Sequence, residues 1–175
     1  MQQGNYGTEG DLLQSGNYRI TDFQAAILLE GLKRLPEQNK RREENATYLN
    51  SRLRETPGVE PLREDSRETE RAYFNFAFRY FEDEFEGLPV QRFREALSGE
   101  LGIDVEPCYE PLNDCPLYRP HTKKRYRIDE EYWKAIDPRR FDLPACERAY
   151  KEESVNIHHT LLMDSRSGMD QEIGR

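Results

Sequence analysis

The sequence has few apolar residues for its length. Only 35% of its 175 residues are apolar, while 34% carry a charge, and globular chains average about 45–50% apolar residues. Disorder would explain this composition, but the 10 tyrosines and 8 phenylalanines fall in periodic segments, which disordered chains rarely show. We therefore expect a folded chain that draws part of its core from a larger body.

An excess of basic charge and a long apolar run are also lacking. The net charge is −8, which disfavours binding to phosphate backbones and anionic lipid surfaces. No segment approaches the roughly 20 apolar residues of a membrane span, and the N-terminus does not resemble a signal peptide. Three widely spaced cysteines make neither a disulfide framework nor a CxxC pair. These features predict a cytoplasmic protein with no nucleic-acid or membrane partner.

Short motifs that carry a mechanism are missing as well. The sequence contains no GxGxxG, Walker loop, GxSxG or HExxH, so no catalytic residue is assigned. The spacing of Cys108, Cys115 and His121 matches no compact zinc pattern, and no metal site is expected. Pairing of Cys108 or Cys115 with His158 or His159, as in a thiol hydrolase, would require proximity in space. Two interpretations stay open for His158 and His159, a structural role and a catalytic role.

The N-terminal third of the chain shows where its first helix begins. Residues 1–16 contain four glycines and no periodicity. Thr21 and Gln24 then form a capping box, which predicts that a helix starts there. The stretch 25–29 is apolar on nearly all sides, which predicts burial on more than one side. Pro36 is expected to end this helix or to begin the next one.

The remaining periodicity predicts an α+β or α/β fold with helices covering one face of a small, mostly antiparallel sheet. A second helix should run from 36 to 56, with a solvated charge run on its outer face. Strands are expected at 72–81, 103–112 and 154–158, and a loop at 113–127. Helices are expected at 89–101, 130–136, 145–153 and after residue 165. Both ends of the sequence are those expected of a piece of a longer protein.

The segment "GNYR" at 16–19 precedes the predicted capping box. A helix N-terminus gathers unpaired N–H groups, and Asn17 and Arg19 beside it would complete a pocket for a phosphate or a carboxylate. Asn and Gly are also common turn residues, so a turn with local caps is the alternative interpretation.

Two parts of the sequence resemble the DegT/StrS family of pyridoxal-phosphate (PLP) sugar aminotransferases: "GNYRITDFQAAILLEGLKRL" and "RREENATYLNSRLRETPGVEPL". "GIDVEPCYEPLNDCPLYRPHTKKRY" and "FDLPACERAYKEESVNIHHTLLM" are similar to the branch that aminates scyllo-inosose-type cyclitols. The resemblance implies the C-terminal part of a fold-type I transferase. Residues 1–35 would be the end of the large domain and the helix entry, and 36–175 a long bridging helix and the small domain.

The resemblance also implies site residues in a homodimer that shares its active sites. Asn17 would reach the phosphate of PLP in the partner subunit, and Arg19 would bind the carboxylate of the amino donor. Tyr109, Glu110 and Asn113 would border the keto-sugar or keto-cyclitol, although many family members have histidine where this chain has Asn113.

The Schiff-base lysine of the family has no counterpart in this sequence. All six lysines lie in charged or loop surroundings, which do not suit a reactive amine; they are Lys33, Lys40, Lys123, Lys124, Lys134 and Lys151. Two hypotheses follow. The chain is part of an aminotransferase that moves an amino group from an amino acid such as glutamine to a cyclitol ketone, or it is a catalytically incomplete dimerisation or binding module.

Overall fold

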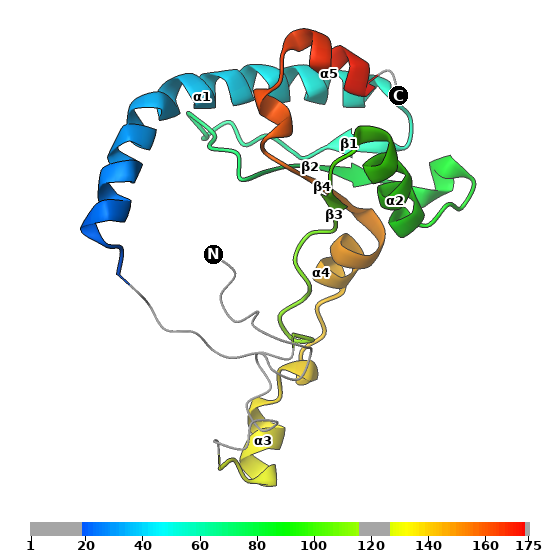
Figure 1. The fold of residues 1–175 in the computed structure, drawn as a ribbon. Helices are drawn as coiled ribbons and strands as arrows, with labels where there is room; N and C mark the ends of the chain where they lie inside the picture. The colour runs from blue at the N-terminus through cyan, green and yellow to red at the C-terminus, as the bar shows by residue number, and fades with distance from the viewer. Residues whose placement is uncertain (1–18, 116–126, 174–175) are drawn as a thin grey trace. The chain divides into compact units, whose positions relative to one another are not determined.

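A computed structural model describes residues 19–115 and 127–173 of the chain. The chain divides into two compact units. One unit combines residues 1–20 with 109–147, and the other combines 21–108 with 148–175. The second unit contains all four strands of the described chain and its longest helix, α1 (Figure 1).

Helix α1 spans Asp22–Glu55 and begins as the capping box predicts. The Thr21 hydroxyl accepts a hydrogen bond from the Gln24 backbone N–H at 3.3 Å, and the Gln24 side chain accepts one from the Thr21 backbone at 2.9 Å. The expected break at Pro36 is wrong, because α1 continues through this residue. One lost backbone hydrogen bond is outweighed here by the packing of the later turns, where the buried residues of α1 are found.

The sheet has four strands in the order β1-β2-β4-β3 and is antiparallel throughout. The strands are β1 (Val59–Pro61), β2 (Asn75–Tyr80), β3 (Val105–Glu106) and β4 (Ser154–His158). The central pairing places Phe78 opposite Val155 and Phe76 opposite Ile157. The mostly antiparallel sheet predicted from the sequence is confirmed, and β1 is an additional strand.

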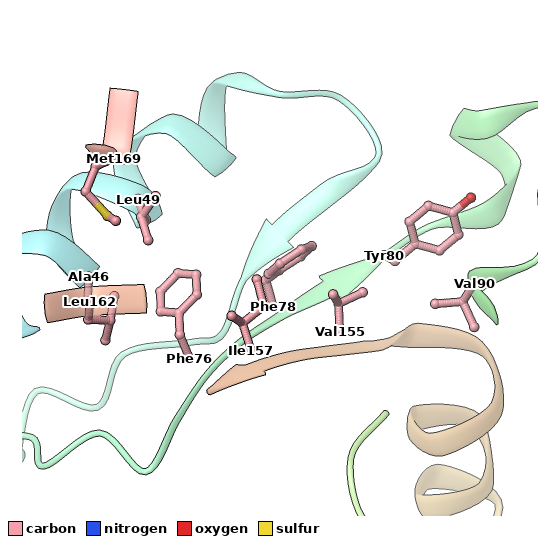
Figure 2. Packing of buried hydrophobic residues seen from close by; sticks show 10 residues of the cluster. All are labelled: Ala46, Leu49, Phe76, Phe78, Tyr80, Val90, Val155, Ile157, Leu162 and Met169. Carbon is pink, nitrogen blue, oxygen red and sulfur yellow. The ribbon is translucent and has the colours of Figure 1, made fainter. Parts of the chain in front are cut away.

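One face of the sheet carries the hydrophobic core (Figure 2). The side chains at every second position of β2 are buried, as are their neighbours on β4, which follows from the two-residue period of a strand. Residues of α1, α2 and the C-terminal segment complete this cluster: Ala46, Leu49, Val90, Leu162 and Met169. The strand was expected to begin at residue 72, but Phe74 precedes β2 and is 66% exposed.

The other helices lie close to their predicted positions. They are α2 (Val90–Leu101), α3 (Glu130–Ile136), α4 (Pro144–Arg148) and α5 (Arg166–Ile173). The 3-10 helices are η1 (Glu82–Phe85), η4 (Pro138–Arg140) and η6 (Leu161–Met163), and the π-helix η5 (Ala149–Glu153) continues α4. Helix α5 contacts α1 (Figure 1). None of the helices within the described ranges is long and apolar enough to cross a membrane.

The first half of α1 differs from its sequence-based expectation. Phe23 is 77% exposed and Leu29 is 61% exposed, although burial on more than one side was expected for the stretch 25–29. The same holds for most large apolar side chains of the segment, namely Ile20, Ile27, Leu28, Leu32 and Leu35. The described part of the chain therefore leaves an apolar helix surface uncovered, which is uncommon in a soluble monomer.

Candidate functional site

The "GNYR" segment lies only partly within the described residues. Asn17, the predicted phosphate contact, lies outside them. Arg19 is exposed two residues before the N-cap Thr21, and within the described chain it makes no hydrogen bond or ion pair. A guanidinium suits a planar anion such as a carboxylate, and this role of Arg19 stays a prediction.

The three other predicted contacts lie on one segment, Tyr109–Asn113, which follows β3. Tyr109 is 83% exposed, and Glu110 is also exposed. Asn113 is only 8% exposed, and its Nδ2 donates a hydrogen bond to the backbone oxygen of Phe141 at 2.9 Å. Its Oδ1 is buried without a hydrogen-bond partner. The segment therefore has two accessible polar side chains, Tyr109 and Glu110. The third, Asn113, is buried and hydrogen-bonded within the protein.

Sequence patterns did not reveal the Asn113–Phe141 hydrogen bond. The two residues are 28 positions apart, and the acceptor is a backbone oxygen, which any residue type would supply. The only local signal is the turn closed by the hydrogen bond from the Asp114 N–H to the Pro111 oxygen at 3.0 Å, since Asn and Pro are common in turns.

No lysine of the described chain has the setting of a Schiff-base lysine. Lys33, Lys40, Lys134 and Lys151 are all exposed, and the Lys33 ammonium lies 2.6 Å from the Glu30 carboxylate. A reactive lysine needs a lowered pKa, which burial or a neighbouring cation supplies. The described residues therefore do not form a PLP site by themselves.

The rings of His158 and His159 lie against each other at the end of β4, with their centroids 4.2 Å apart and their planes tilted by 38°. The Nδ1 atom of His158 lies 3.0 Å from the Thr160 hydroxyl, whereas the Nδ1 atom of His159 is buried without a partner. Burial lowers the pKa of His159, and the positive charges of His158 and Arg42 lower it further. This setting favours the neutral imidazole, as expected for a structural histidine.

Arg42 is a departure from the predicted solvated charge run. Its side chain is only 8% exposed and donates to the Asn39 side chain at 3.1 Å. The preceding Arg41 donates to the backbone oxygen of Asp164, at 3.1 Å from one of its terminal nitrogens. Within the predicted solvated run, Arg42 is therefore buried, whereas Lys40, Arg41, Glu43 and Glu44 are exposed.

The three cysteines are not joined in disulfides. Cys108, Cys115 and Cys146 are free thiols, and the backbone N–H of Cys108 donates to the Ser154 hydroxyl at 2.8 Å. Among the described residues, no group of three His, Cys, Asp or Glu side chains is placed to hold a metal ion.

A cleft with a volume of about 840 Å³ lies between α1 and segment 64–73 in the second unit. Its lining is rich in carboxylates, including Glu43 and Glu68, and none of the described site candidates contributes to it. Burial, with the charge of Glu43 beside it, raises the pKa of Tyr73 to about 12. An acidic cleft of this kind does not suit a phosphate or a carboxylate ligand.

The fold defines the class of protein to which the chain is similar. It matches the crystal structure of 3-amino-5-hydroxybenzoic acid synthase with a TM-score of 0.61 and 24% identity, covering 94% of this chain and 40% of that one. It also matches an aminotransferase, TlmJ, from Streptoalloteichus hindustanus with a TM-score of 0.59, covering 91% of this chain and 36% of that one. The chain thus has the fold of part of an aminotransferase.

The chain belongs to the DegT/DnrJ/EryC1/StrS aminotransferase family, whose profile matches residues 2–161. It is 41% identical over 160 residues to L-glutamine:2-deoxy-scyllo-inosose aminotransferase of Streptoalloteichus tenebrarius. It is 37% identical over 158 residues to L-glutamine:scyllo-inosose aminotransferase of Streptomyces griseus. These matches cover 91% and 90% of this chain but only 37% of either relative. The resemblance inferred from the sequence motifs is confirmed.

Proposed function

We propose that this chain acts as the C-terminal portion of a PLP-dependent aminotransferase that moves an amino group from glutamine to a scyllo-inosose-like keto-cyclitol. The observation that carries the proposal is the 41% identity to an L-glutamine:2-deoxy-scyllo-inosose aminotransferase across 91% of the chain. PLP supplies the electron sink for amino transfer when it is bound, and the protein supplies binding and orientation.

The described residues support a contributing role rather than a complete site. Every described lysine is exposed, and the resemblance implies that the lysine that binds PLP lies upstream in the family. We therefore propose that this lysine lies in a part of the enzyme outside this chain. Residues 1–35 would complete the large domain, and 36–175 would form the bridging helix and the small domain. The exposed apolar side chains of the first half of α1, Phe23 and Leu29 among them, would pack against the rest of a homodimer.

Each site residue has a proposed task. Asn17 would donate its amide N–H to the phosphate of PLP in the partner subunit. Arg19 would bind the donor carboxylate through two parallel N–H groups, as a guanidinium does. Tyr109 and Glu110 would contact hydroxyl groups of the cyclitol, since a phenol donates or accepts and a carboxylate accepts. Asn113 belongs to the same segment.

The test uses the protein encoded by the complete reading frame, incubated with PLP, glutamine and scyllo-inosose. We expect visible cofactor absorption, trapping of PLP on a lysine by borohydride, and formation of an amino-cyclitol. The matched control is the 175-residue chain alone, which should trap no cofactor. If the complete protein neither traps PLP nor aminates the ketone, the chain is a binding or dimerisation module instead.

Asn17 and Arg19 can be tested separately in the complete enzyme. Asn17→Ala should weaken PLP retention without changing the unfolding midpoint, and Arg19→Lys should raise the KM for glutamine while leaving PLP retention intact. Unchanged PLP affinity in Asn17→Ala would reject the phosphate role. An unchanged KM for glutamine in Arg19→Lys would reject the carboxylate role.

A further inference from the structure

The segment from Tyr109 to Asn113 combines exposed and buried residues. Tyr109, Glu110 and Leu112 are exposed, whereas Pro111 and Asn113 are buried. The hydrogen bond from the Asp114 N–H to the Pro111 oxygen, 3.0 Å long, closes a turn around the buried pair. The turn thus has an inner side that faces the protein and an outer side that faces solvent.

Asn113 is buried, unlike the exposed Tyr109 and Glu110. Its Nδ2 already donates to the Phe141 oxygen at 2.9 Å. Its Oδ1 is buried and unpartnered, so a substrate hydroxyl cannot reach this atom without opening the turn. A buried amide is stabilising only while its hydrogen bonds are made, so the Phe141 contact is the feature that holds the turn in this conformation.

We propose that Asn113 is a positioning residue, which fixes the turn to the backbone at Phe141 and so holds Tyr109 and Glu110 in place for a polyhydroxylated ring. The identity of the ring rests on the proposed function. The hydrogen bond between Asn113 and Phe141, which we call the clamp, can be tested without a substrate. Tyr109 and Glu110 are two backbone positions or fewer from the buried Pro111, so they move with the turn. A tyrosine phenol and a carboxylate are a fitting pair for neighbouring hydroxyl groups of a cyclitol.

The experiment compares Asn113→Leu, which removes the donor but keeps the branching of the side chain at Cγ, with the unchanged complete enzyme. We expect the KM for scyllo-inosose to rise about tenfold, the effect of one lost buried hydrogen bond. The KM for glutamine and the kcat should change less than about twofold, because a positioning residue for the cyclitol does not touch the donor.

A double-mutant cycle separates positioning from direct contact. If Asn113 acts through the two exposed side chains, Asn113→Leu should have little further effect on KM in a Tyr109→Phe, Glu110→Gln background. An effect of the same size in that background would overturn the proposal, since it would mean that Asn113 binds the ring independently. An unchanged KM in the single variant would also overturn it.

Amide hydrogen exchange provides the readout that does not depend on activity. Exchange of residues 109–114 should accelerate in Asn113→Leu without ligand, while exchange of β2 and β4 stays the same. Asn113→Gln, which keeps the amide but displaces it by one methylene, serves as the second variant and should show the same change. Faster exchange in an enzyme that aminates no cyclitol would retain the clamp and reject the proposed function. Unchanged exchange in both variants would reject the clamp.

Discussion

The side-chain amide of Asn45 on α1 donates to the backbone oxygen of Leu162 at 2.9 Å, across 117 residues of sequence. The same Nδ2 lies 3.0 Å from the Asp164 oxygen. Asn45 is 6% exposed, and Leu162 is fully buried. This one side chain thus joins the long helix to the segment that follows β4.

Replacing Asn45 should therefore destabilise the second unit. Asn45→Ala leaves the Leu162 oxygen without this donor, while the Asp164 oxygen keeps its hydrogen bond from Arg41. The free energy of unfolding should fall by about 1–3 kcal/mol. Urea unfolding measures this change. The exposed neighbour Glu44 provides the control, and Glu44→Ala should stay within about 0.5 kcal/mol of the unchanged protein. Equal effects of the two substitutions would contradict the prediction.

The setting of His159 predicts a loss of stability in mild acid. Its pKa in the folded protein is lowered from the usual value of 6.5, first by burial and then by the charges of His158 and Arg42. Because the folded state disfavours the proton, this contribution to stability is complete above pH 6.5 and is lost as the pH falls through the lower folded pKa. The unfolding midpoint should therefore drop between neutral pH and pH 5.

Histidine variants identify the source of that drop. His159→Gln should flatten the dependence of the unfolding midpoint on pH. His158→Gln should reduce the slope only in part, because burial, the larger cause, remains. A slope that is unchanged in His159→Gln would assign the acid sensitivity to other groups.

Alanine substitutions at Gly58 and Gly87 compare a crowded backbone position with an open one. Both have positive φ angles, +83° and +79°. A Cβ atom on Gly58 would lie 2.3 Å from the Phe85 ring, whereas one on Gly87 would meet nothing within 4 Å. Alanine at either position carries backbone strain of about 1 kcal/mol or more. Gly58→Ala should be clearly the more destabilising in thermal unfolding, and equal losses would mean that the Phe85 ring moves freely.

Replacing Pro36 should increase the stability of the protein rather than decrease it. Since α1 continues through Pro36, Pro36→Ala should restore a backbone hydrogen bond to the helix and raise the free energy of unfolding by up to about 3 kcal/mol. Urea unfolding measures the gain. The adjacent Glu37→Ala, at an exposed position, is the control and should change little. A loss of stability in Pro36→Ala would show that the packing of α1 depends on a bend at the proline.

Sequence periodicity predicted most elements because their signals are local. The capping box at Thr21 involves residues three positions apart, and the buried face of β2 repeats every second residue. The family was also recognisable from its motifs. Asn17, the predicted phosphate contact, lies outside the described residues, and the roles of Arg19, Tyr109 and Glu110 stay predictions.

The start of α1, the strand and helix periods and the family motifs could be predicted from the sequence alone, because each depends on neighbours within a few residues. Only the tertiary structure decided that α1 passes through Pro36, that Arg42 is buried and that Asn113 is held by Phe141. Those outcomes depend on packing and on hydrogen-bond partners far along the chain, for which no local pattern of residues carries a signal.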